Sequence, residues 1–532
     1  MNNIKILDCT LRDGGYINNW RFGYSNIKSI ITRLTKANID IVETGFLEDG
    51  EYDPDKSLFS DVCQIEDVLP ADRGKTQFVA MTRYGHLDIK NLREYDGKSI
   101  NGIRVTFHED EAEEAIAYCK LVKDKGYKTY VQPVGTTSYT DEYLLKLIKI
   151  VNELQPYAFY IVDTLGLMRK NDLLRMYYLI DNNLDQDIVI GFHSHNNLQL
   201  SFSNAQELVD LHTKRQIILD SSVYGMGRGA GNLNTELIAQ HLNFTRDYIY
   251  NTDYLLEIID ETIDAISKKY TWGYSVPYYL AAINNCHPNY ATYLLNRKTL
   301  PVKSIGKILR SIHPDQRELY NEKYVAELYL QFQKHQIDDE KSVRELRQEL
   351  YGKNVLVVAP GNSINIQRKN IETYLSQHDN VVVISVNFDG DGIKPDYCFF
   401  SNNKRFQRFL ETQRSVSSKV IVTSNVEIEE QKELVSYVVN YSDHLNQQPL
   451  VNDNATLMLF SLLARLDIQE IAVAGFDGFQ YESTNNYVEN ELETGLDRDT
   501  IKEMNRQISE VVREYSKVIC LKFITDSLYQ ST

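Results

Sequence analysis

The stretch KILDCTLRDGGY, residues 5–16, begins as an apolar strand and ends in a charged turn. Ile6 and Leu7 belong to a run suited to a buried strand, and Arg12, Asp13 and two glycines follow it. A hairpin turn would account for the glycines, but it would not require an adjacent arginine and aspartate. The stretch therefore predicts a strand that delivers two charged side chains to a site, with glycines that let the backbone approach a ligand.

The first half of the chain alternates strands and helices with a regular period. Eight apolar, β-branched runs within residues 4–248 are separated by amphipathic stretches such as 26–37, 111–126 and 141–154. Eight βα units in about 250 residues are typical of a (β/α)₈ TIM barrel, and a doubly wound sheet is the alternative. We predict a TIM barrel over residues 1–250.

The rest of the chain divides into two further parts. Residues 251–352 are mostly helical in pattern and charged, which indicates a helical extension and linker. A second α/β rhythm starts with VLVVAPGNSI (355–364) and continues with four more strand-like runs, NVVVISVNF, PDYCFFS, KVIVTS and IQEIAVAGFDGF. We therefore predict a Rossmann-like domain over 353–532.

Composition excludes several classes of protein. The chain has 532 residues and a net charge of −17, which argues against broad binding of nucleic acid. No apolar run is long enough for a membrane span and no signal peptide precedes the first strand, so we expect a cytoplasmic protein. The six scattered cysteines fit reduced thiols. An exposed helical extension makes a homodimer a reasonable expectation.

The sharpest local motif is the pair of histidines in HSHNN (193–197), at the end of the seventh predicted strand. Residues two apart on a strand point to the same side, so both imidazoles can reach one ion. In a TIM barrel the carboxyl ends of all strands meet at one mouth, which brings Asp13 to the same place. Asp13, His193 and His195 are therefore predicted to bind a divalent metal.

Other strand ends supply candidates for substrate binding and catalysis. Arg12 beside the metal is placed to stabilise an oxyanion on the substrate. Glu43 and Thr164 are predicted to bind substrate, although a structural or supporting role is the alternative for Glu43. His108 is a candidate base, and the glycine-rich loop 225–236 is either a ligand-facing turn or merely a tight connection.

Three segments, TLRDGGY (10–16), HSHNN and GMGRGAGNLNTE (225–236), together resemble the motifs of the DRE-TIM metallolyase superfamily, whose members are metal-dependent aldolases and lyases. The most similar branch is that of the 4-hydroxy-2-oxovalerate aldolases, with hydroxymethylglutaryl-CoA (HMG-CoA) lyases and isopropylmalate synthases more distant. The resemblance covers residues 1 to about 250. It implies that Asn232 is a further metal ligand and that Arg12 stabilises an enolate.

The chain departs from these relatives at two positions. The oxovalerate aldolases carry a histidine base three residues after the motif aspartate, where this chain has Tyr16. The CoA lyases carry a cysteine in the glycine-rich loop, and GMGRGAG has none. We predict that Tyr16 takes part in proton transfer, with its pKa lowered by Arg12 and the metal, and that His108 is the reserve base; mere packing of Tyr16 is the alternative.

The C-terminal half resembles the nucleotide-binding fold of sialyltransferase-like proteins. By that resemblance the glycine turn after the first strand faces a nucleotide or nucleotide-sugar phosphate, and a turn without ligand is the alternative. The residues implied are Gly361, Asn362, Ser363, Asn387 and Asn454.

Together these features predict a carbon–carbon lyase or aldolase that acts on a 2-oxo acid such as pyruvate and an aldehyde, with Mn²⁺ or Mg²⁺ as cofactor, or else Zn²⁺ or Co²⁺. Its fusion to a nucleotide-sugar-like domain suggests a role in surface-glycan (polysaccharide) precursor biosynthesis. One alternative is Claisen-type condensation with acetyl-CoA. Another is a barrel without catalysis that serves as a scaffold for the C-terminal domain.

Overall fold

The computed structural model divides the chain into two compact units, Met1–Asn289 and Tyr290–Thr532. Each unit is described by itself. The boundary falls inside the predicted helical extension, so the helices up to 289 group with the barrel and those from 290 group with the C-terminal sheet. The structure describes residues 3–211, 213–317, 319–390, 392–412, 417–428, 432–480, 486–487 and 497–530.

The first unit is an eight-stranded parallel barrel, as predicted. Each strand pairs in parallel with its neighbours, and β1 pairs with both β9 and β2, which closes the sheet. A short extra strand, β3 (Leu58–Phe59), pairs with the carboxyl-terminal end of β2. The barrel strands are β1 (Ile4–Asp8), β2 (Ile41–Leu47), β4 (Gln77–Arg83), β5 (Gly102–Phe107), β6 (Lys128–Pro133), β7 (Ala158–Asp163), β8 (Val189–Ser194) and β9 (Ile217–Ser221).

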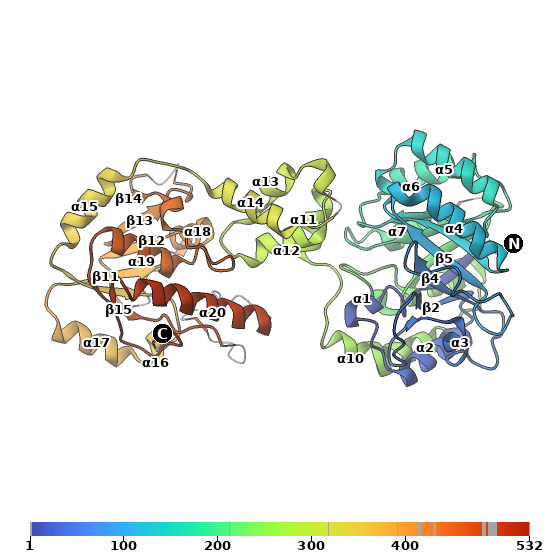
Figure 1. Ribbon diagram of the computed structural model, residues 1–532, viewed down its shortest axis with the longest axis horizontal. Coiled ribbons are helices and arrows are strands. Elements are labelled where there is room, and N and C mark those ends of the chain that lie inside the picture. Colours follow the sequence, from blue (N-terminus) through green and yellow to red (C-terminus); the bar gives the residue numbers. More distant parts are fainter. Residues whose placement is uncertain are drawn as a thin grey trace. The chain divides into compact units, whose positions relative to one another are not determined.

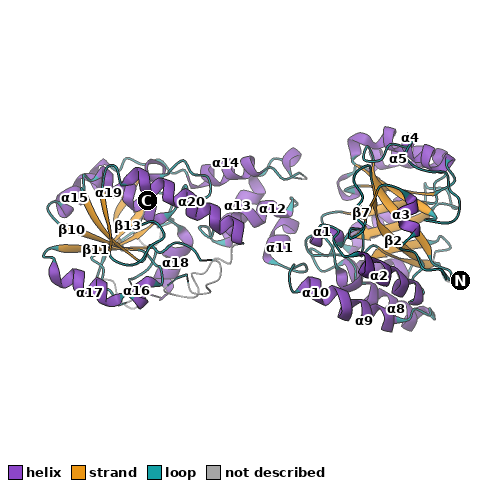
Figure 2. Ribbon diagram, turned by 60° about the horizontal axis from the view of Figure 1, so that its bottom comes forward, coloured by secondary structure: helices purple, strands orange, loops and turns teal. Residues whose placement is uncertain are grey.

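Helices cover the outside of this ring of strands (Figures 1 and 2). Their apolar residues recur at helical spacing, as in α2, where Ile27, Ile30, Ile31 and Leu34 are buried. The covering helices are α2 (Tyr24–Lys36), α3 (Val62–Glu66), α4 (Ala112–Asp124), α5 (Asp141–Leu154), α6 (Lys170–Asp181), α7 (Ser201–Val209) and α8 (Thr235–Arg246). Shorter helices α1 (Gly15–Asn18), α9 (Thr252–Ile258), α10 (Asp264–Ser267) and α11 (Val276–Ile283) complete the described part of this unit.

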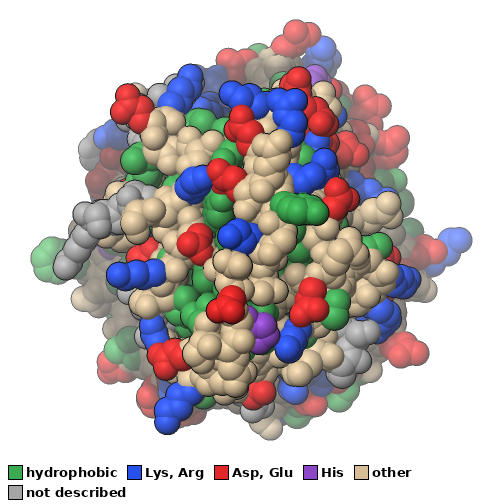
Figure 3. Space-filling model, turned by 90° about the vertical axis from the view of Figure 1, so that its left-hand side faces the viewer, with side chains coloured by type: hydrophobic (Ala, Val, Ile, Leu, Met, Phe, Trp, Pro, Cys, Tyr) green, Lys and Arg blue, Asp and Glu red, His purple; other side chains and the backbone are tan. Residues whose placement is uncertain are grey.

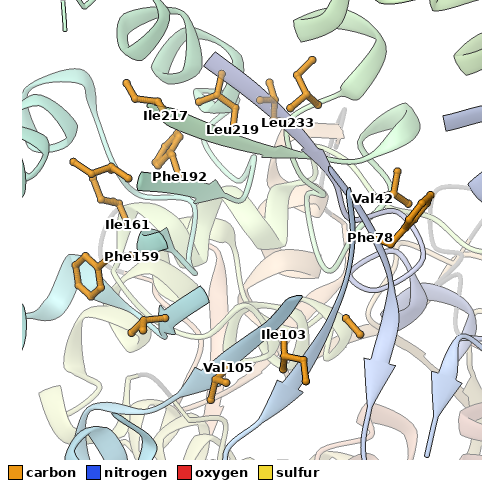
Figure 4. Close-up of a cluster of buried hydrophobic side chains, with 14 of the residues drawn as sticks. Val42, Phe78, Ile103, Val105, Phe159, Ile161, Phe192, Ile217, Leu219 and Leu233 are labelled. Atoms are coloured by element: carbon orange, nitrogen blue, oxygen red, sulfur yellow. The ribbon is translucent and has the colours of Figure 1, made fainter. Parts of the chain in front are cut away.

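Alternating strand residues build two apolar layers. One set, including Val42, Ile103 and Phe192, points outward into the layer between strands and helices (Figure 4). The other set, including Leu7 and Tyr130, fills the interior of the barrel. Both layers follow from the period of two along a strand, and together they explain why the strand sequences are apolar almost throughout.

The second unit contains a seven-stranded, fully parallel sheet in the order β14-β13-β12-β11-β10-β15-β16. The order reverses between β10 and β15, as in a doubly wound Rossmann-like domain, so the predicted fold class is confirmed. The sequence predicted five of these strands and missed β14 and β16. The strands are β10 (Asn354–Val358), β11 (Val381–Val386), β12 (Tyr397–Phe400), β13 (Lys419–Thr423), β14 (Val435–Val439), β15 (Glu470–Ala474) and β16 (Cys520–Phe523).

Helices cover both faces of this sheet (Figure 2). Residues of α15, α19 and α20 pack on one face, and residues of α17 and α18 pack on the other. Helices α13 and α14, together with α12 from Tyr290 onward, belong to the same unit and are joined to it by polar contacts such as Gln333 Nε2 to Tyr441 OH at 2.9 Å. The helices are α12 (Pro288–Asn296), α13 (Val302–Ser311), α14 (Glu322–Gln333), α15 (Glu340–Leu350), α16 (Ser363–Ile366), α17 (Arg368–Gln377), α18 (Asn403–Thr412), α19 (Ala455–Arg465) and α20 (Arg498–Tyr515).

Acidic and basic side chains are interspersed on the face of the molecule that Figure 3 shows. This mixture, with the net charge of −17, does not resemble the continuous basic face of a nucleic-acid-binding protein. Among the described residues, no helix combines the length and the apolar character needed to cross a membrane.

Candidate metal centre and active site

Asp13, His193 and His195 meet at the carboxyl end of the barrel strands. One ligand atom from each lies within 4.8 Å of the others. Asp13 is placed by a turn after β1, in which its backbone N–H donates to the Cys9 carbonyl at 2.8 Å. His193 lies in β8 and His195 directly follows that strand. The structure thus brings together the three residues that the sequence selected as metal ligands. These three residues are called the metal cluster below.

Asp13 is held as a carboxylate. Arg12 Nη1 donates to its Oδ1 at 2.5 Å, and Asn232 Nδ2 donates to its Oδ2 at 2.6 Å. Burial raises the pKa of Asp13, but Arg12, His195 and His193 together outweigh burial and hold this pKa well below its usual range. The carboxylate is therefore available as an anionic ligand at neutral pH.

The two imidazoles are oriented differently but are both suited to bind a metal. His193 Nδ1 lies 3.0 Å from Oδ2 of the buried Asp220, which leaves Nε2 for a ligand. Burial lowers the pKa of His195 to about 4, and the charges of Arg12 and Arg228 act in the same direction. A histidine that is neutral at pH 7 can donate a nitrogen lone pair to a metal.

The buried polar atoms near the cluster that have no hydrogen-bond partner among the described residues include Arg12 Nη2 and Asn232 Oδ1. An unpaired buried donor and an unpaired buried acceptor are both costly unless a ligand uses them. The amide oxygen of Asn232 suits a divalent cation, and the guanidinium of Arg12 suits an anionic oxygen. The donor set as a whole, with one carboxylate, two imidazoles and one amide oxygen, fits a divalent metal with open positions.

A continuous chain of buried charges links Arg12 to His193. Arg12 Nε donates to Glu43 Oε2 at 2.8 Å, and the other oxygen of Glu43 lies 2.9 Å from Arg104 Nη1. Arg104 also pairs with Asp220, which holds His193. Glu43 thus contacts two arginines, and its contact with Arg12 fixes the position of that guanidinium.

Sequence reasoning missed Arg104 and Asp220. Arg104 is fully buried, and its guanidinium carbon lies 4.8 Å from the centre of the Tyr160 ring. The signal that could have identified them is one charged residue in each of two otherwise apolar strands, GIRVTF and IILDS. A charge in a strand that is buried on both faces requires a partner from another strand.

The predicted catalytic tyrosine lies in an aromatic cluster at the mouth. The ring of Tyr16 is 4.7 Å from that of Trp20 and 6.1 Å from that of Phe46, and its side chain is half exposed. Burial raises the pKa of Tyr16, while Arg12 and Arg228 act in the opposite direction. In the protein alone this shift is opposite to the predicted lowering, because loss of solvent outweighs the two arginines.

In the part of the chain that the structure describes, the contacts of His108 and Thr164 are with loop residues and not with the metal cluster. The His108 backbone N–H donates to Glu111 Oε2 at 2.9 Å, and among the described residues no hydrogen bond or ion pair joins His108 to Asp13. Thr164 Oγ1 accepts the N–H of Gly135 at 2.9 Å, which ties together the loops after β7 and β6.

The glycines of the two mouth loops make room for protein atoms. A Cβ on Gly14 would lie 2.3 Å from the Thr10 carbonyl oxygen, and one on Gly15 would lie 2.0 Å from the Trp20 ring. The absence of side chains at Gly14 and Gly15 was predicted to make room for a ligand. The structure shows instead that the Thr10 carbonyl and the Trp20 ring occupy the space that a side chain would fill. In the loop 225–236, a Cβ on Gly227 would lie 2.7 Å from Asp13 Oδ2, so this loop does contact the metal cluster.

The residues predicted to bind a nucleotide support local structure in the second unit. The Ser363 N–H donates to Asp477 Oδ2 at 2.7 Å, the Gly361 N–H donates to the Gly475 carbonyl at 2.8 Å, and Asn454 Oδ1 accepts from the first turn of α19. Asn387 Oδ1 accepts the Ser401 N–H at 3.2 Å, and the Asn362 N–H lies 3.4 Å from the Asn486 carbonyl. Nucleotide binding by these residues stays a prediction.

The proteins compared below each match about half of the chain. A 4-hydroxy-2-oxovalerate aldolase from Geobacillus genomosp. 3 is 26% identical over 243 residues, which are 45% of this chain and 70% of that protein. An oxaloacetate decarboxylase from Mycobacterium tuberculosis is 25% identical over 245 residues, 44% of this chain and 69% of that protein. A crystal structure of the N-terminal domain of a candidate aldolase from Bacteroides vulgatus is 26% identical, covers 55% of this chain and 96% of its own, and has a TM-score of 0.47. The HMGL-like family model matches residues 3–266 of this chain.

Proposed function

We propose that the barrel is a divalent-metal-dependent carbon–carbon lyase or aldolase that acts through the enolate of a 2-oxo acid such as pyruvate. The observation that carries this proposal is the buried cluster of Asp13, His193 and His195 with the unpaired Nη2 of Arg12 beside it. The names of the relatives in the comparisons support it, since 4-hydroxy-2-oxovalerate and oxaloacetate are both 2-oxo acids.

In this proposal Asp13, His193, His195 and the amide oxygen of Asn232 would hold the ion, most simply Mn²⁺ or Mg²⁺, with Zn²⁺ or Co²⁺ as alternatives. When bound, a divalent ion supplies Lewis-acid polarisation of the 2-oxo group. Arg12 donates from Nη2 to the enolate oxygen, and Glu43 and Asp13 fix the orientation of its guanidinium. Tyr16, at the mouth, exchanges a proton with the hydroxyl at the carbon where the bond breaks or forms.

The test separates enolate chemistry from the rest of the reaction. The full chain is freed of metal with a chelator, reloaded with Mn²⁺ and incubated with pyruvate in D₂O, and the methyl protons are followed by NMR. We expect exchange that depends on metal and one bound ion per chain by elemental analysis. Asp13→Ala and His195→Ala should abolish both, whereas His86→Ala, which removes a half-exposed histidine paired with Glu48, should alter neither.

The same experiment addresses the alternatives. If both cluster variants keep full metal occupancy, the metal site is wrong. A barrel that binds no metal and exchanges no protons would favour the scaffold role. Consumption of acetyl-CoA with a 2-oxo acid as acceptor would favour a Claisen-type condensation. A role in glycan-precursor synthesis and nucleotide-sugar binding by the C-terminal domain rest on resemblance alone and stay predictions.

A further inference from the structure

Arg228 is an exposed arginine in the glycine-rich loop between β9 and α8. The residue before it, Gly227, approaches the cluster so closely that a Cβ there would lie 2.7 Å from Asp13 Oδ2 and 2.4 Å from Asn232 Nδ2. Arg228 therefore directly follows a residue that contacts the predicted metal site.

No carboxylate compensates this arginine. Among the described residues, the guanidinium of Arg228 has one hydrogen-bond partner, His287, with Nη2 and Nε2 2.7 Å apart, and no acidic side chain within ion-pair distance. Burial, followed by the charge of Arg228, lowers the pKa of His287 to about 4. At neutral pH His287 is thus an uncharged acceptor, and the positive charge of Arg228 stays unneutralised.

The other arginines of the site are neutralised. Arg12 pairs with Asp13 and Glu43, and Arg104 pairs with Glu43 and Asp220. Arg83, at the carboxyl end of β4, lies 3.8 Å from Glu111. Arg228 is the exception, and an uncompensated guanidinium beside a metal cluster is a binding group for an anion.

The segment after the barrel holds this loop in place. Trp272 Nε1 donates to the Tyr224 carbonyl at 3.2 Å, and the Gly273 N–H donates to the Gly229 carbonyl at 3.2 Å. The Tyr278 ring of α11 lies 3.5 Å from the position of a Cβ on Gly229. Arg228 is therefore presented by a loop that is packed on its outer side, with His287 holding one of its nitrogens.

We propose that Arg228 binds an anionic group, a carboxylate or a phosphate, on the aldehyde half of the substrate. This inference rests on the function proposed above. Arg12 is buried and Arg228 is exposed, so the 2-oxo acid occupies the deep end of the site and the aldehyde extends outward to Arg228. In condensation the enolate carbon bonds to the aldehyde carbon and the aldehyde oxygen takes up a proton; cleavage is the reverse.

A kinetic test uses matched pairs of aldehydes with the full, metal-loaded enzyme and pyruvate. Glycolaldehyde phosphate is compared with glycolaldehyde, and succinic semialdehyde with butyraldehyde. We expect kcat/KM to be at least tenfold higher for the charged member of one pair, and the variant R228M to reduce that ratio tenfold or more. R228K should retain part of the preference, and R83M, which removes an arginine at the same end of the barrel, should retain all of it.

The pair that shows the preference identifies the anion as phosphate or carboxylate. Equal kcat/KM within both pairs, or an equal ratio in wild type and R228M, would overturn the inference. If pyruvate proton exchange occurs and charge has no effect, Arg228 alone is misassigned. If exchange is absent, the proposed function fails, and calorimetric titration with 2-phosphoglycolate and succinate decides the anion site: tenfold weaker binding to R228M than to R83M supports it, and equal binding overturns it.

Discussion

His193 Nδ1 lies 3.0 Å from Oδ2 of Asp220, and both side chains are buried. This contact fixes the ring nitrogen that faces the metal cluster, and Arg104 in turn fixes Asp220. We expect Asp220→Asn to weaken Mn²⁺ binding about 10- to 100-fold, because the carboxylate that orients His193 is lost. Competition with a fluorescent chelator measures the affinity.

A control for the loss of a buried ion pair is available in the same barrel. Asp181, the last residue of α6, pairs with the buried Arg215, which comes two residues before β9, so this pair lies at the amino-terminal end of the barrel strands, opposite the predicted metal site. Asp181→Asn should leave Mn²⁺ affinity unchanged even where it lowers stability. Equal losses of affinity in the two variants would mean that Asp220 acts only through the stability of the barrel.

Gly227→Ala tests how closely the glycine-rich loop contacts the ligands. The added Cβ would lie 2.4 Å from Asn232 Nδ2 and 2.7 Å from Asp13 Oδ2, so one of these side chains must move. We expect a fall in kcat of about 100-fold, since a displacement of about 1 Å in an active site has effects of this size. Gly50→Ala, where no atom lies within 4 Å of the new Cβ, is the matched control and should retain activity.

The barrel and its metal cluster were predictable because both follow from local pattern. Apolar runs of strand length locate the strands, and the rule that parallel strand ends meet at one mouth brings Asp13 to His193 and His195. The buried charge chain was not predictable, because a single arginine in GIRVTF does not reveal which carboxylates it meets. Arg104 reaches Glu43 on β2 and Asp220 on β9 only when the sheet closes.

The C-terminal sheet shows where local pattern fails. β14 and β16 are edge strands, with alternating or partly exposed residues, and lack the continuous apolar run that marks a central strand. The Asn454 side chain caps α19, a role that asparagine commonly takes, and its predicted place in a nucleotide pocket stays a prediction. In the barrel, Gly15 was predicted to admit a ligand, but the nearest atoms to its position belong to Trp20.

The pKa of Asp8 makes stability depend on pH. Burial raises this pKa from 3.8 to about 6, although hydrogen bonds from Thr235 and Thr10 oppose the rise. Since the folded pKa exceeds the unfolded one, the stabilisation from the bound proton is complete below pH about 4 and is lost as pH rises through 6. Relative to Asp8→Asn, the wild type should lose up to about 3 kcal/mol of unfolding free energy between pH 4 and pH 7.5.

Urea unfolding followed by tryptophan fluorescence measures this difference. The chain has two tryptophans, Trp20 and Trp272, and both lie in the unit that contains Asp8. The signal therefore reports on the barrel and not on the C-terminal sheet. A difference between the two proteins that does not change with pH would show that Asp8 ionises in the folded barrel as it does in the unfolded chain.

Tyr16→Phe tests the position at which this chain departs from the histidine of the oxovalerate aldolases. The substitution keeps the ring contacts with Trp20 and Phe46 and removes only the hydroxyl, so folding and metal content should not change. A tyrosine hydroxyl, with an ordinary pKa of about 10, is protonated at neutral pH and is suited to donate a proton to the developing alkoxide. We expect kcat for aldol condensation to fall about 100-fold or more, while pyruvate proton exchange, which needs no proton at the aldehyde oxygen, falls less. Equal losses in both reactions would place Tyr16 at the enolate instead, and unchanged rates would leave it with packing at the mouth as its only role.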